Sequence, residues 1–104
     1  MEQNNHKLIV TIVNRGKGGT VVDISHKAGA TGGTILFGHG TAVRLMLGIS
    51  IEPEQEAVLT LIREDKAQKV FDAIAKEMDL DKPQKGIAFM VPLDQVVGLR
   101  KEDE

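Results

Sequence analysis

The sequence predicts one α+β domain with the element order β-α-β-β-α-β. Two observations lead to this prediction. Four short segments are rich in β-branched and other apolar residues, as buried strands are, and two longer segments repeat small and apolar residues at helical spacing. The chain has 104 residues. This length allows one domain that buries roughly two-thirds of the surface exposed by its unfolded chain.

The composition excludes several classes of function. The chain has no cysteine, so disulfides, thiolate metal sites and thiol nucleophiles are excluded. Its charges are interspersed and sum to −2, which provides no basic field for nucleic acid or an anionic membrane surface. No uncharged apolar stretch is long enough to cross a membrane. We expect a cytoplasmic protein with a disordered tail at 1–5, a single domain at 6–100 and a charged tail at 101–104.

The first half of the chain is expected to place one helix between two strands. Residues 7–13 are almost continuously apolar, which predicts a central strand that is covered on both faces. Small and apolar residues then recur at intervals of three and four over 17–28, which predicts a helix that Gly29 ends. Residues 34–37 form the second predicted strand.

The segment from Thr41 to Glu54 is ambiguous. Its apolar residues alternate as in a strand, whereas Thr41 and Gly48 suit the two ends of a short helix. We expect a short helix at 42–47, and Pro53 ends whatever precedes it.

The second half is expected to repeat the order strand, helix, strand. Residues 57–63 have the composition of a buried strand. Asp65 is a good helix cap, and the apolar residues over 67–78 follow helical spacing more regularly than any others in the chain. After a loop, residues 87–91 form the fourth predicted strand, and 93–99 form a short apolar turn.

These elements give a four-stranded antiparallel sheet with both helices on one face, the ferredoxin-like arrangement. The other face then has no helix to cover it. The first strand is nevertheless apolar on both sides, with Leu8, Val10 and Ile12 on one of them. Because a large exposed apolar face usually belongs to a subunit interface, we expect oligomerisation through this open face.

Glycines gather around the second strand. Gly38 and Gly40 follow it, where bare backbone can approach a ligand closely. A glycine-rich strand end of this kind is a candidate cradle for an anion or a nucleotide, although Gly-His-Gly is also an ordinary turn.

Several motifs, taken in order, resemble the PII-like signalling proteins, the superfamily that includes the PII nitrogen regulators. They are the residues 7–13, 28–34, 38–41 and 85–92. The resemblance covers nearly the whole chain after Asn5. It implies a homotrimer whose sheets face a common centre and whose intersubunit clefts bind an adenine nucleotide such as ATP, ADP or AMP.

The resemblance also implies positions for the nucleotide. Thr34 matches a threonine near the family's adenine pocket, and Gly40 matches a glycine at the base of the regulatory loop. Gly86 matches a glycine of the phosphate-contacting loop, and Arg100 matches an arginine that reaches the phosphates from the adjacent subunit. Backbone N–H groups and an arginine fork suit phosphate oxygens. We add Gly38, from the glycine-rich strand end, to this set.

The sequence departs from the family pattern in three respects. Ile87 stands where the family has a lysine after the loop glycine, and Lys85 is the candidate substitute. The chain has no tyrosine, which excludes uridylylation, and no glutamine lies between Gly40 and Glu54, which disfavours 2-oxoglutarate sensing by the usual geometry. The loop is short and apolar, so it is either a docking surface for a target, such as a transporter or a metabolic enzyme, or part of the trimer packing.

Three functional hypotheses result. The first is a non-enzymatic PII-like regulator. The second is a trimeric metal-binding or scaffold protein similar to the CutA proteins, which share this architecture; Ile87 favours it, and His39 is the histidine to test. The third is a slow nucleotide hydrolase, which the lack of a recognisable nucleophile or base disfavours. We interpret Glu52, Glu54 and Glu56 as a solvated cluster, and we predict no catalytic residue and no metal site.

Overall fold

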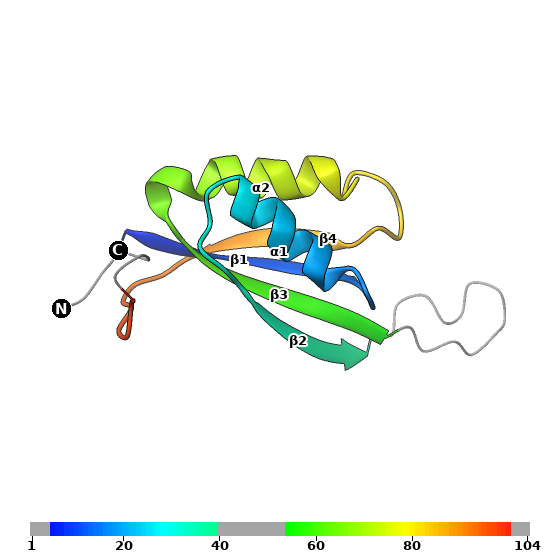
Figure 1. Cartoon of the computed structure of the whole chain (residues 1–104), viewed down its shortest axis with the longest axis horizontal. Coiled ribbons are helices and arrows are strands. Elements are labelled where there is room, and N and C mark those ends of the chain that lie inside the picture. The colour runs from blue at the N-terminus through cyan, green and yellow to red at the C-terminus, as the bar shows by residue number, and fades with distance from the viewer. Residues whose placement is uncertain (1–4, 40–53, 101–104) are drawn as a thin grey trace, which may run out of the picture.

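Within residues 5–39 and 54–100, which the computed structural model describes, one antiparallel sheet carries two helices on one face (Figure 1). The elements are β1 (His6–Asn14), α1 (Gly18–Lys27), β2 (Thr34–His39), β3 (Glu54–Arg63), α2 (Glu64–Glu77) and β4 (Ile87–Pro92). The strands lie in the order β2-β3-β1-β4. The predicted β-α-β-β-α-β fold is therefore confirmed, and the short helix predicted at 42–47 lies outside the described residues.

Several element boundaries differ from the prediction. β2 extends to His39, so Gly38 lies in the strand and not after it. β3 begins at Glu54 rather than at Ala57, because its first residues pair with both neighbours, Glu54 with His39 and Gln55 with Asn14. Strand pairing thus overrides the low strand propensity of glutamate. α2 begins directly after β3, so Asp65 lies in its first turn and is not the cap.

The start of α2 is stabilised by charge instead of a side-chain cap. Arg63 occupies the N-cap position and makes no cap hydrogen bond, whereas Glu64 and Asp65 place negative charge in the first turn, where the helix dipole favours it. The Arg63 guanidinium donates to the Asp65 carboxylate over 3.2 Å. This hydrogen bond holds the pKa of the exposed Asp65 carboxyl below its usual value.

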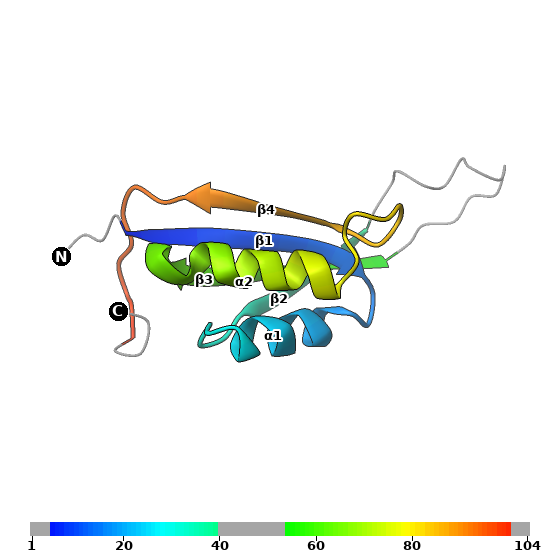
Figure 2. The same ribbon diagram turned by 90° about the horizontal axis from the view of Figure 1, so that it is seen from above.

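The core lies between the sheet and the helices, which both cover the same side (Figure 2). Side chains alternate along each strand, so every second residue of β1 and β3 faces the helices. The large apolar residues among them that are fully or almost fully buried, with their partners on α1 and α2, are Ile9, Val13, Val21, Ile24, Val58, Ile62, Val70 and Ile74. This arrangement explains why the helical spacing in the sequence predicted both helices well.

Two buried hydroxyls in this core lead to a testable prediction about stability. Thr11 and Thr60 are fully buried, and neither Oγ1 has a hydrogen-bond partner among the described residues. Burying such a hydroxyl without a hydrogen-bond partner lowers the free energy of unfolding by about 1–3 kcal/mol. Because valine has nearly the same shape, we expect Thr60→Val to raise the free energy of unfolding by about 1 kcal/mol in urea denaturation. The exposed control Thr20→Val should change little, and a less stable Thr60→Val protein would contradict the prediction.

The opposite sheet face is apolar and carries neither of the two helices. Across the four strands, Leu36, Ala57, Ile12 and Ile87 form one row of paired residues, and Thr34, Leu59, Val10 and Phe89 form the next. Several of the large side chains remain exposed, among them Leu36 (49%), Ile87 (57%) and Phe89 (42%). The open apolar face expected from the sequence is therefore present. We name these two rows the open face.

Candidate functional site

The loops that could hold a ligand gather at one end of the sheet, the right-hand end in Figure 1. β1 and β2 end there, and β3 and β4 begin there. The Asn14 side-chain amide donates to the backbone oxygen of Gln84 over 3.4 Å, which connects the turn after β1 with the loop before β4. Three predicted site residues, Gly38, Lys85 and Gly86, lie at this end.

Gly86 is required by the fold itself. It has φ +135°, and a Cβ at this position would lie 2.5 Å from the backbone oxygen of Ile12. The loop backbone therefore packs directly on β1, which only glycine permits. A ligand role for Gly86 has to act through its backbone, and replacing it would disturb the fold as well as any site.

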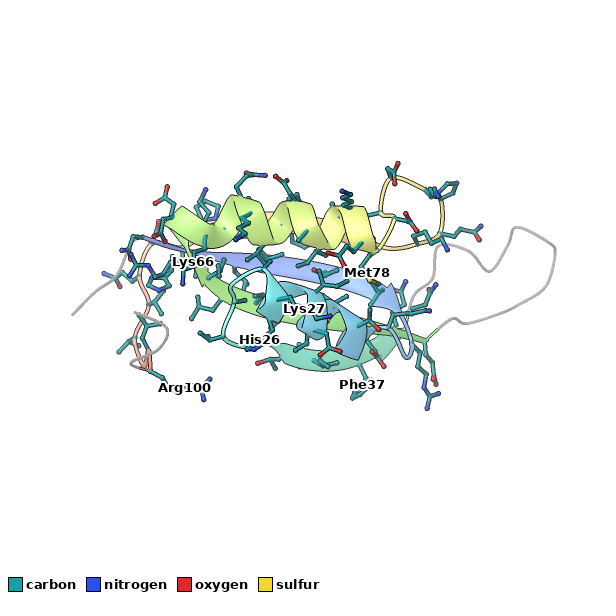
Figure 3. All side chains as sticks on the ribbon, turned by 45° about the horizontal axis from the view of Figure 1, so that its top comes forward. His26, Lys27, Phe37, Lys66, Met78 and Arg100 are labelled. Atoms are coloured by element: carbon teal, nitrogen blue, oxygen red, sulfur yellow. The ribbon has the colours of Figure 1, made fainter. Side chains whose placement is uncertain are left out.

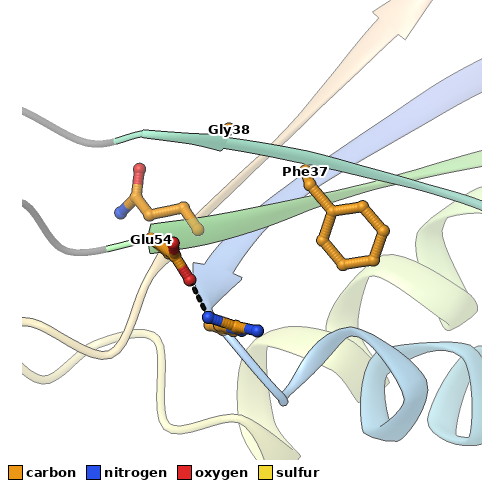
Figure 4. Close-up of a pocket in the computed structure, with 5 residues that line it drawn as sticks. Phe37, Gly38 and Glu54 are labelled. Carbon is orange, nitrogen blue, oxygen red and sulfur yellow. Dashed lines mark hydrogen bonds and ion pairs between the residues drawn. The ribbon is translucent and has the colours of Figure 1, made fainter.

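Gly38 lies beside an open cavity of about 410 Å³, shown in Figure 4. The cavity is lined by Arg15, Phe37, Gly38, Glu54 and Gln55. Phe37 is 78% exposed, although it belongs to a strand. Gly40 lies outside the described residues. Of these five residues, only Gly38 was predicted from the sequence as a site residue.

The turn between β1 and α1 is fixed to the start of β3. The backbone N–H of Arg15 donates to the backbone oxygen of Glu54 over 3.0 Å, and the two side chains form an ion pair, marked by the dashed line in Figure 4. The Glu56 carboxylate accepts hydrogen bonds from the backbone N–H groups of Gly16 at 2.9 Å and Gly18 at 2.7 Å. The turn therefore has a defined position relative to β3.

Glu56 acts as the N-terminal cap of α1 from a distant strand. It is only 7% exposed, so the prediction of a solvated side chain is wrong for this residue. Lys17, at the N-cap position, makes no side-chain cap bond, and the Glu56 anion takes that role at the positive end of the helix. A Cβ on Gly18 would overlap the Glu56 carboxylate, which explains the glycine there.

The remaining predicted site residues lie elsewhere in the chain. Thr34 begins the edge strand β2 and pairs with Leu59, at one end of a row of the open face. Arg100 lies toward the opposite end of the sheet from Phe37, as Figure 3 shows, because the chain after β4 runs past the start of β1, where Leu93 donates to His6. Gly38 is on one edge strand, β2, and Gly86 directly precedes the other, β4, three strand spacings or roughly 14 Å away. A single chain does not bring the predicted residues together.

The described residues contain no group of three or more His, Asp or Glu side chains that could hold a metal ion. The His26 ring lies 3.1 Å from the backbone oxygen of Ala30, and His6 is buried next to Asn5. The side chain of His39 lies outside the described part of the structure. Neither α1 nor α2 has the length and apolar character that a membrane-spanning helix needs.

The sequence comparison establishes the family. Residues 6–103 match the family described as "Nitrogen regulatory protein P-II", and the chain belongs to this family. No curated protein sequence matches the chain.

Solved structures with a similar fold include three PII proteins. PII of Arabidopsis thaliana bound to citrate has a TM-score of 0.71 at 16% identity, over 96% of this chain and 85% of that one. GlnK of B. subtilis in complex with ATP has a TM-score of 0.68 at 13% identity, over 88% and 84%. CPII of Thiomonas intermedia K12, bound to ADP, AMP and acetate, has a TM-score of 0.66 at 15% identity, over 88% and 87%. At these identities the likeness concerns the fold.

Proposed function

We propose that this protein is a PII-like signal-transduction regulator, a homotrimer that binds an adenine nucleotide between subunits and regulates a target protein. The observation that carries the proposal is the P-II family match over residues 6–103. The target would be a cytoplasmic enzyme of nitrogen metabolism or a membrane transporter. Because members of this family are described as regulators, we propose that the protein is not an enzyme.

The ligands of the similar structures support the choice of nucleotide. The B. subtilis protein is in complex with ATP, and the Thiomonas protein holds ADP and AMP. The Arabidopsis protein holds citrate, a carboxylate anion. An adenine nucleotide, or a related small anion, is therefore the ligand class that we propose here.

The open face supports the assembly. Ile87 pairs with Ile12 in an apolar row and is 57% exposed in the single chain, which suits a residue that packs against another subunit. Its place in this row also explains why an apolar residue stands where the family has a lysine.

The separation of the site residues supports a composite site. Thr34 and Arg100 lie away from Gly38 and Gly86 in one chain, so one subunit cannot supply all of them to the same small ligand. A neighbouring subunit that presents its own Arg100 would complete the cleft. We propose Thr34, Gly38, Gly40, Lys85, Gly86 and Arg100 as the residues of this composite site.

Titration of the purified protein with ATP, ADP and AMP by calorimetry tests the function. We expect micromolar dissociation constants for at least one nucleotide, which corresponds to about 8 kcal/mol of binding free energy. Arg100→Ala should weaken the binding about tenfold or more, because a charge-assisted hydrogen bond is lost. No heat with any of the three nucleotides, from a sample that light scattering shows to be an intact oligomer, would contradict the proposal.

A further inference from the structure

The cavity beside Gly38 contains a cation that the family resemblance did not indicate. We propose that Arg15 binds the phosphate group of the ligand there, and that Glu54 competes with the ligand for it. This inference rests on the proposed function, because it assigns the phosphate-binding side chain within the same site.

The residues that line the cavity suit a phosphate that carries an organic group. Arg15 is the one cationic side chain among the five lining residues, and Gly38 leaves bare backbone beside it. The largely exposed Phe37 ring gives the cavity an apolar wall. A guanidinium is a planar fork of donors that matches two phosphate oxygens at once, so these residues select an oxyanion.

The backbone of Arg15 is held on both sides, whereas its side chain is accessible. Its own N–H is bonded to the Glu54 oxygen, and the next N–H, that of Gly16, is bonded to the buried Glu56 carboxylate. The Arg15 side chain is 70% exposed. Because the backbone is already fixed and the guanidinium is exposed, binding costs less conformational entropy. Glu56 is thus a positioning residue for Arg15.

The ion pair with Glu54 is weak enough to exchange. Both side chains are largely solvated, at 70% and 46% exposure, and exposed pairs of this kind contribute little. A phosphate with two charges and two aligned oxygens is a stronger partner for the guanidinium than one carboxylate. Glu54 therefore lowers the affinity for the anion, both by occupying Arg15 and by repelling the ligand.

Arg15, rather than Lys85, is the cation that we assign to the phosphate. Lys85, the candidate substitute in the sequence, precedes β4 at the far edge of the sheet, whereas the cavity lies at β2 and β3. The two candidate cations can therefore be distinguished by substitution. Loss of Arg15 should weaken phosphate binding more than loss of Lys85.

The experiment uses the full chain and titrates it with ATP and with inorganic tripolyphosphate. Arg15→Gln should weaken ATP binding about tenfold or more, and Glu54→Gln should tighten it about threefold. Lys85→Gln should have a smaller effect than Arg15→Gln. Arg63→Gln is the charge-matched control, since it also removes an exposed arginine from an ion pair, at the other end of β3, and it should change the affinity less than about twofold.

The outcomes separate this inference from the proposed function. Binding of ATP that Arg15→Gln leaves unchanged, in a variant with the parent's unfolding midpoint, would overturn the inference and leave the function standing. Tripolyphosphate binding that depends on Arg15, without any nucleotide binding, would support the inference and overturn the function. A wild-type protein that binds neither probe would overturn both.

Discussion

Val10→Lys is expected to convert the proposed trimer into a monomer. Val10 lies on the central strand β1, between Leu59 and Phe89 in a row of the open face. An ammonium placed in the middle of an apolar interface loses its hydration without gaining a partner, which costs several kcal/mol per subunit. Light scattering should show that the mass falls from three chains to one, and nucleotide binding should be lost with the intersubunit clefts.

The control for this variant is Thr20→Lys. It adds the same charge at an exposed position on α1, outside the open face, and should leave the proposed trimer intact. A Val10→Lys protein that remains trimeric would show that the open face is not the subunit interface.

Glu56→Val is expected to lower the free energy of unfolding by about 2–4 kcal/mol. The change leaves the N–H groups of Gly16 and Gly18 without their acceptor and removes the anion at the N-terminus of α1. Valine suits a strand, so a loss of strand propensity does not account for the effect. Urea denaturation followed by circular dichroism measures the difference.

The matched control is Glu54→Val on the same strand. Its exposed ion pair should contribute less than about 1 kcal/mol, so this variant should remain close to the parent. A Glu56→Val protein as stable as the parent would contradict this prediction. It would mean that desolvating the buried carboxylate costs as much free energy as its hydrogen bonds contribute.

The sequence predicts the elements of the fold because their patterns are local. Two patterns can be recognised within a few consecutive residues. They are the alternation that buries Ile9 and Val13 and the helical spacing that buries Val70 and Ile74. The role of Glu56 is not local. Its position on the same strand face as Val58 fits burial, but its charge indicates solvent, and its donor at Gly16 is 40 positions away.

The candidate site is less predictable for the same reason. The glycine motifs indicated Gly86. Glycine is required there because the loop packs closely on Ile12, and the sequence pattern does not distinguish this structural requirement from a ligand-binding role. Arg15 follows a strand in what looked like an ordinary break, and only the pairing of β1 with β3 places it beside Glu54 and Gly38. The geometry of the candidate site therefore depends on contacts between segments that are far apart in the sequence.

Native mass spectrometry of the full chain with increasing ATP distinguishes a site shared between subunits from a site within one chain. We expect a complex of three chains that takes up to three ATP molecules, one for each intersubunit cleft. A single chain that binds ATP by itself would contradict the composite site. Three chains that take up no ATP at saturating concentration would contradict the proposed function.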